Sequence, residues 1–77
     1  MGTILRYANF RVEIIPGDHK PAHVHIIGPD FIAKVSLDDC ECYYARGLNQ
    51  KSILVIEKFV TKNKDFLIQA WGDINEK

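Results

Sequence analysis

The chain has 77 residues, 47% of them hydrophobic, which suits one small domain rather than two. Ten basic and ten acidic side chains give a formal net charge of zero, which argues against tight binding of nucleic acid through overall positive charge. No run approaches the roughly 20 apolar residues of a membrane span and no signal peptide is evident, so we expect a soluble, cytoplasmic protein without membrane contact.

The first part of the chain has the hydrophobic pattern of short β-strands. Residues 7–15 alternate apolar and charged side chains, which predicts a half-buried strand. A second extended run covers residues 22–27, and a tight turn at residues 28–30 connects it to a third strand over residues 31–37. A short fourth strand is expected over residues 40–44.

From Asn49 onward, apolar residues recur at helical spacing. Asn49 is predicted to cap a helix that ends near Lys62, and Asn63 to cap a second helix. The expected inner stripes are Ser52, Ile53, Ile56, Phe59 and Val60 in the first helix and Phe66, Leu67, Ala70, Trp71 and Ile74 in the second. Strands followed by helices predict one α+β domain over residues 1–77: a small antiparallel β-sheet of three to four strands, followed by two C-terminal helices packed on one face.

Three features near the ends of these elements have structural interpretations. Cys40 and Cys42 are too close for an unstrained disulfide, so we expect reduced thiols on one strand face, inside the core. Gly47 is expected to have a positive φ in a turn. Tyr43 and Tyr44 are expected to point to opposite faces of a strand, which leaves one of them exposed.

All three histidines lie within the stretch DHKPAHVHI. His23 and His25 occupy positions i and i+2 of a predicted strand, so their side chains point to the same face with Cα atoms about 6.6 Å apart. His19, in the preceding loop, can fold over the same position. One interpretation is purely structural: the imidazoles fill a half-exposed sheet face or bond to backbone carbonyls.

A second interpretation is a metal site. A His-x-His strand pair with one further ligand can hold a divalent metal such as zinc and leave a fourth position for water. His19 or Asp18 would supply that ligand, so the metal candidates are His19, His23 and His25, with Asp18 as the alternative third ligand.

A third interpretation is acid–base cleavage of RNA. One neutral and one protonated imidazole can deprotonate a ribose 2′-OH and protonate the leaving oxygen, while an arginine neutralises charge on the phosphate. The residues predicted on this hypothesis are His23, His25 and Arg46 as catalytic groups, and Arg11, Lys20 and Tyr44 as substrate-binding groups.

The order of several short segments resembles one bacterial family, domain-of-unknown-function family 4160. The segments are Thr3-Ile4-Leu5-Arg6, Pro21-Ala22-His23-Val24-His25-Ile26, Ala33-Lys34-Val35, Leu37-Asp38, Arg46-Gly47 and Ala70-Trp71. The family signature is a Pro-Pro-His-x-His segment followed by an Arg-Gly step into two C-terminal helices. Ala22 departs from it, because the second proline usually stands there, but both histidines stay in register.

The resemblance implies a toxin-like component of a bacterial toxin–antitoxin pair, encoded beside a small partner protein. We therefore expect a toxin that acts on nucleic acid through the His-x-His site, with a small antitoxin-like protein as its partner. The alternative functions are a non-catalytic protein-binding module, which uses a sheet edge or forms a homo-oligomer, and a metal-binding domain without a catalytic role.

Overall fold

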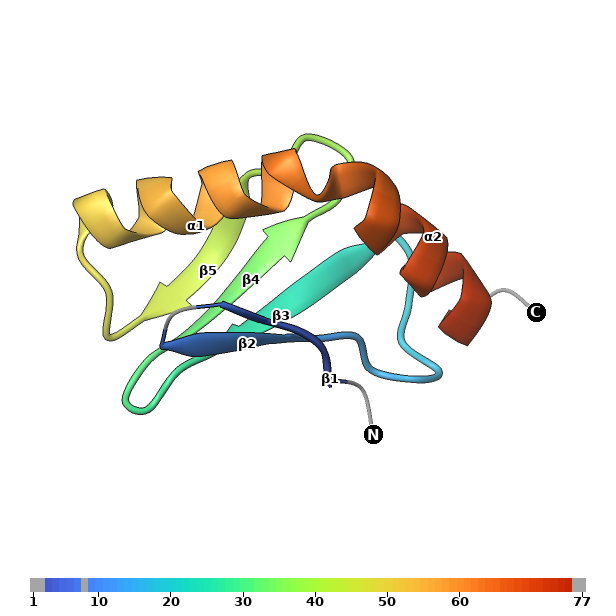
Figure 1. Cartoon of the computed structure of the whole chain (residues 1–77), viewed down its shortest axis with the longest axis horizontal. Helices are drawn as coiled ribbons and strands as arrows, with labels where there is room; N and C mark the ends of the chain where they lie inside the picture. Colours follow the sequence, from blue (N-terminus) through green and yellow to red (C-terminus); the bar gives the residue numbers. More distant parts are fainter. Residues whose placement is uncertain (1–2, 8, 76–77) are drawn as a thin grey trace.

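The computed structural model describes residues 3–7 and 9–75, and within them the chain forms one antiparallel sheet and two helices (Figure 1). The elements are β1 (Thr3–Tyr7), β2 (Phe10–Glu13), β3 (His23–Ile27), β4 (Ile32–Ser36), β5 (Cys42–Arg46), α1 (Gln50–Lys62) and α2 (Lys64–Asn75). The strand order β1-β2-β3-β4-β5 follows the sequence, so each strand pairs with the next one along the chain. Both helices lie over the same face of the sheet (Figure 1).

The sheet has five strands rather than the three to four that were predicted. The strand expected over residues 7–15 is confirmed as β2 with its alternation of buried and open positions, but it is shorter than predicted, because Tyr7 belongs to β1 and pairs with Phe10 across the β1–β2 hairpin. Residue 8, like residues 1–2 and 76–77 of the predicted domain, lies outside the described residues. In β1, Ile4 and Leu5 are adjacent and both partly buried, and the pairing with β2 shifts register there. Because of this irregularity, β1 does not show the strict alternation of apolar and polar residues by which a strand is predicted.

The fourth predicted strand is displaced along the chain. It was expected over residues 40–44, but β5 begins at Cys42 and extends through Arg46. Cys40 lies before it with a φ of 60°, and its side chain is buried. Cys42 is partly buried against the core, and both thiols are free.

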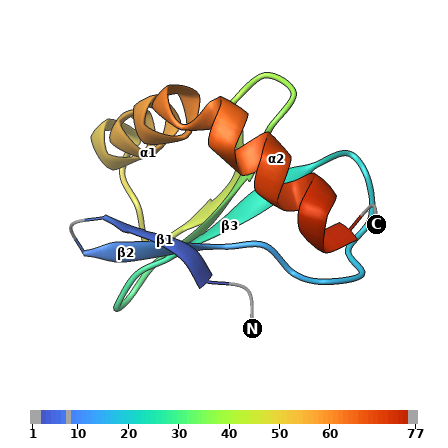
Figure 2. The same cartoon turned by 45° about the vertical axis from the view of Figure 1, so that its right-hand side comes forward.

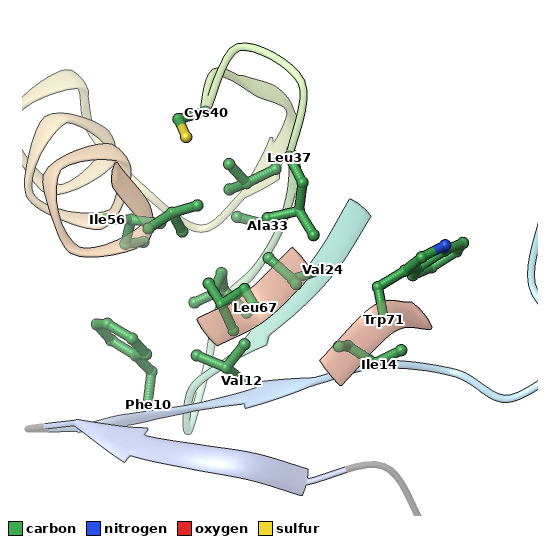
Figure 3. Close-up of a cluster of buried hydrophobic side chains, with 13 residues drawn as sticks. Phe10, Val12, Ile14, Val24, Ala33, Leu37, Cys40, Ile56, Leu67 and Trp71 are labelled. Atoms are coloured by element: carbon green, nitrogen blue, oxygen red, sulfur yellow. The ribbon is translucent and has the colours of Figure 1, made fainter. Parts of the chain in front are cut away.

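The core lies between the helices and one face of the sheet (Figure 3). The strands contribute Phe10, Val12, Val24, Ile26, Ala33 and Val35, the residues that directly follow β2 and β4 contribute Ile14 and Leu37, and the helices contribute Ile56, Val60, Leu67 and Trp71. The prediction that Trp71 is buried is confirmed, but Phe66 is 50% exposed. Phe66 adjoins Leu67 in a helix with 3.6 residues per turn, so it points about 100° away from the side that faces the sheet.

The predicted ends of α1 are confirmed, whereas Asn63 is the C-cap of α1 and its side chain donates to the Phe59 carbonyl rather than capping α2. Asn49 caps α1, and its Oδ1 accepts a bond of 2.8 Å from the Ser52 amide. Asn63 ends α1 by donating its backbone N–H to Phe59 and Val60, and its own carbonyl accepts from Leu67 in the first turn of α2. Among the described residues, neither helix has the length and apolar character needed to cross a bilayer.

The side of the sheet away from the helices is here named the open face. Two residues that lie directly opposite each other on neighbouring strands point to the same face of the sheet. The residues that share a face with His23 and His25 can therefore be followed through the pairing from strand to strand. The open face consists of Arg6, Arg11, Glu13, His23, His25, Ile27, Ile32, Lys34, Ser36, Tyr44 and Arg46.

Candidate metal centre and adjoining hollow

The loop between β2 and β3 brings Asp18 against the two strand histidines. The carboxylate Oδ2 of Asp18 lies 2.8 Å from Nε2 of His23 and 3.4 Å from Nε2 of His25. The two imidazole rings have centroids 5.3 Å apart, which confirms that both side chains point to one face. The side chain of Asp18 therefore lies beside both histidines, although Asp18 belongs to the loop and not to β3. The three residues lie within eight positions of the sequence.

The loop is held in place by the C-terminal end of α2. Oδ1 of Asn75 accepts hydrogen bonds from the backbone amides of Gly17, at 2.7 Å, and Asp18, at 3.1 Å. Gly17 has a φ of +79°, which suits the sharp turn just before Asp18. Figure 2 shows the end of α2 beside this loop. The position of Asp18 thus depends on a residue more than fifty positions away.

His23 is enclosed on several sides. Its ring centroid lies 5.2 Å from that of Trp71 and 6.3 Å from that of Tyr43. Its Nδ1 lies 2.8 Å from the carbonyl oxygen of Pro21. The side chains of His23 and His25 are only 13% and 16% exposed, so neither is a freely solvated surface group.

The two ring nitrogens of His23 face different partners. A carbonyl oxygen only accepts hydrogen bonds, so Nδ1 carries a proton and donates it to Pro21. Nε2 faces a carboxylate oxygen, which is also only an acceptor when ionised. A neutral His23 would direct the Nε2 lone pair at this negative oxygen. Nε2 is therefore the ring nitrogen that is left to bind a proton or a metal ion beside Asp18.

The carboxyl group of Asp18 is ionised at neutral pH. Burial acts to raise its pKa, but the hydrogen bonds from the His19 backbone amide and the His25 ring, together with the charge and hydrogen bond of His23, outweigh burial and lower the pKa. The pKa of the Tyr43 phenol is shifted upward: burial raises it, and electrostatic repulsion, chiefly from the Asp18 carboxylate, raises it further. The site therefore contains a fixed carboxylate and a protonated phenol.

Among the described residues, one group of possible metal ligands converges: Asp18, His23 and His25, whose ligand atoms all lie within 4.8 Å of one another. His19, the third predicted metal ligand, is exposed and its ring is not part of this group. Its backbone amide donates to Oδ1 of Asp18 at 3.0 Å and so helps to orient the carboxylate. The structure thus places Asp18, the alternative ligand, in the position considered for His19.

A hollow of about 450 Å³ adjoins this group. It is lined by Asp18, His19, Lys20, Pro21, His23, Ser36 and Tyr43. Of the residues predicted to bind substrate, Lys20 is the one that lies here. Tyr43 was not predicted as a site residue.

Tyr43 reaches the hollow because β5 has an irregular register. Tyr44 pairs with Lys34 but Cys42 pairs with Val35, so Tyr43 is an extra residue between two paired positions. The expectation that Tyr43 and Tyr44 point to opposite faces is wrong for this reason. Tyr43 approaches His23 and Tyr44 lies beside Lys34, both of which belong to the open face. The two tyrosines are 57% and 40% exposed.

The predicted arginines lie farther along the open face. Arg46 pairs with Ile32, and Ile32 pairs with Ile27, which pairs with Arg11. His23 instead pairs with Ser36, four residues along β4 from Ile32, a separation of about 13 Å. Arg11 also forms an ion pair of 2.7 Å with Glu13. The structure therefore does not bring Arg46 or Arg11 beside His23.

The family model for a domain of unknown function, DUF4160, matches residues 9–72 of the chain. This range contains the converging group, the hollow and most of the open face. No curated protein and no solved structure matches the chain.

Proposed function

The chain belongs to the DUF4160 family, and from its open face and converging side chains we propose that it binds RNA and hydrolyses a phosphodiester bond at Asp18, His23 and His25. The proposal includes its role as the toxin component of a two-protein pair, as the family resemblance implies. Hydrolysis consumes one water, whose oxygen bonds to phosphorus while one phosphorus–oxygen ester bond breaks and the leaving oxygen takes up the proton.

The observation that carries the proposal is the meeting of two imidazoles and one carboxylate at the edge of a hollow. Its volume of about 450 Å³ is within the range of small-molecule sites, about 300–1,000 Å³. Lys20 and Tyr43 line it together with Asp18 and His23. A nucleotide placed there would meet a cationic side chain, an aromatic ring and the reactive group at once.

The open face supports a single strand of RNA as the ligand. Although the whole chain is neutral, the strands of this face carry the cations Arg6, Arg11, Lys34 and Arg46 and the single acidic residue Glu13. Cations that track a phosphate backbone and aromatic rings on which bases stack are the common features of surfaces that bind single strands. An antiparallel sheet with exposed aromatic residues is also a known platform for RNA bases.

The partner protein of such a pair would use a different surface. The helices, which cover the other face of the sheet, expose Leu54, Val55, Phe66 and Ile68, each 44–50% exposed. We propose that the small cognate partner covers some of these residues. Co-purification of the two gene products tests whether the complex forms.

Binding of RNA is tested with a short fluorescent single-stranded RNA in an anisotropy titration. The variant Lys34→Ala/Arg46→Ala is expected to bind at least several-fold more weakly and with a shallower salt dependence, because each lost phosphate contact lowers the salt slope by about one. Lys51→Ala is the matched control, because Lys51 is an exposed lysine on α1. Equal affinities for all three proteins would contradict RNA binding on the open face.

Action on RNA is tested by expressing the chain alone and following growth and cellular RNA. Growth arrest with RNA cleavage is expected, and the variant His23→Ala/His25→Ala is expected to abolish both. If the double variant arrests growth as strongly as the parent protein, the reactive group is not the source of toxicity. If the parent protein has no effect on growth or RNA, the toxin role is refuted.

A further inference from the structure

The geometry of the third residue, His25, favours a metal ion over a proton between His23 and Asp18. A proton shared by His23 and Asp18 satisfies only those two atoms, which are 2.8 Å apart. It leaves Nε2 of His25 at 3.4 Å from the same oxygen, at the outer limit of a hydrogen bond. An ion with several coordination positions engages all three atoms together.

Two of the three separations between ligand atoms are close to those around a tetrahedral zinc ion, and the third, between Nε2 of His23 and Nε2 of His25, is no more than 4.8 Å. Ligand bonds of about 2.0–2.1 Å with tetrahedral angles place neighbouring ligand atoms about 3.3 Å apart. The separation between His25 and Asp18 is already 3.4 Å, and that between His23 and Asp18 has to open by about 0.5 Å. A rotation about the side-chain torsion of Asp18 provides a movement of this size.

The surroundings of His23 are those of a metal ligand. Histidines that bind a metal through one ring nitrogen usually donate the other ring N–H to a carbonyl or carboxylate, which fixes the tautomer and the ring orientation. Nδ1 of His23 has this bond to the Pro21 carbonyl at 2.8 Å, so Nε2 is left to coordinate. The carboxylate of Asp18 is likewise held by the His19 amide through its other oxygen.

We propose that Asp18, His23 and His25 bind one zinc-class divalent ion through a carboxylate oxygen and the two Nε2 atoms, with the fourth position open to the hollow. Two imidazoles select against magnesium and calcium, which prefer oxygen ligands. Three protein ligands and one open position are the arrangement of catalytic rather than structural zinc sites. The catalytic role assigned to the ion rests on the proposed function, whereas its binding does not.

The binding test uses untagged protein that has been stripped with a chelator, titrated with Zn²⁺ by calorimetry and with Co²⁺ by absorption. One ion per chain is expected, with a Co²⁺ spectrum that lacks the intense thiolate band, because neither Cys40 nor Cys42 belongs to the site. Asp18→Asn, which preserves size, and His25→Ala are each expected to weaken binding more than tenfold. His19→Ala is the matched control from the same loop and is expected to change affinity less than twofold.

Three results would overturn the metal site: no stoichiometric binding, a thiolate band, or equal losses for His19→Ala and Asp18→Asn. Circular dichroism of each stripped variant separates loss of binding from loss of folding, and His25→Gln replaces His25→Ala if the latter does not fold.

The metal site and the proposed function fail in different ways. RNA cleavage by stripped protein that persists in excess chelator would overturn the catalytic role of the ion but leave its binding and the action on RNA intact. Tight, Asp18-dependent Zn²⁺ binding by a protein that neither binds nor cleaves RNA would support the metal site and overturn the proposed function.

Discussion

Gly47, which follows β5, allows a direct measurement of how closely two turns of the sheet pack. Its φ is +79°, and a Cβ atom added there would lie 2.6 Å from the carbonyl oxygen of Asp30 and 3.3 Å from Cα of Phe31. Gly17 has the same φ of +79°, but a Cβ atom added to it meets nothing within 4 Å. Substituting alanine at each position therefore compares the same backbone strain with and without a steric clash.

The backbone contribution is similar in the two variants. An L-residue in the left-handed region costs about 1–2 kcal/mol, and the smaller conformational entropy of the unfolded alanine chain returns about 0.4–1 kcal/mol. Gly17→Ala is therefore expected to lower the free energy of unfolding by about 1 kcal/mol. Gly47→Ala adds displacement of the backbone at Asp30, for which overpacking typically costs a further 1–3 kcal/mol, giving about 2–4 kcal/mol in total.

The assay is urea unfolding followed by circular dichroism, with thermal unfolding as a second measure. For a domain of this size, about 1 kcal/mol corresponds to a change in Tm of about 4–8 °C, so the two variants should differ clearly. If Gly47→Ala and Gly17→Ala lose stability equally, the close approach of the β5–α1 turn to Asp30 does not exist in solution.

Three further predictions concern the ends of the helices and the acidic group. Asn75→Ala removes the oxygen that accepts hydrogen bonds from the Gly17 and Asp18 amides. It is therefore expected to lower the free energy of unfolding in urea by about 1–2 kcal/mol and to weaken Zn²⁺ binding. A loss of stability without a loss of Zn²⁺ affinity would show that Asn75 does not position Asp18. Asn49→Ala removes the cap of α1 at Ser52 and is expected to cost about 1 kcal/mol, most of which Asn49→Asp should recover; equal losses would exclude capping. Because the pKa of Asp18 is lowered by folding, its contribution is complete above the unfolded value of about 4 and is lost as pH falls through the lower folded value. In metal-stripped protein, the difference in unfolding free energy between the parent and Asp18→Asn should therefore shrink as pH falls below about 4, and a constant difference there would contradict the hydrogen-bonded carboxylate.

The parts of the fold that were predicted correctly depend on neighbouring residues. The strands β2, β3 and β4 alternate between one buried face and one open face, and α1 begins at an asparagine cap. β1 was missed because its adjacent Ile4 and Leu5 break that alternation. The edge strand irregularity at Tyr43 has no local signal either, because it depends on pairing with β4 and on the bond from the Cys42 amide to Glu57 of α1.

The candidate site shows the same division between local and distant causes. Strand geometry alone placed His23 and His25 side by side, and the loop before them supplied two alternatives for the third ligand, Asp18 and His19. The choice between these two is made by Asn75, which lies in α2 and holds the amide of Asp18. A pattern confined to residues 18–25 does not contain that information, although Gly17 beside Asp18 indicated a sharp turn.

The end of α2 links the stability of the core to the candidate site. Trp71 is buried in the core and its ring also packs against His23, while Asn75 holds the loop of Asp18. The buried nitrogens Nε1 of Trp71 and Nδ2 of Asn75 have no hydrogen-bond partner among the described residues. An unsatisfied buried donor costs about 1–3 kcal/mol, so both nitrogens are places where a water or a ligand group can bind with a gain in stability. Both belong to the end of α2 that also contacts Asp18 and His23.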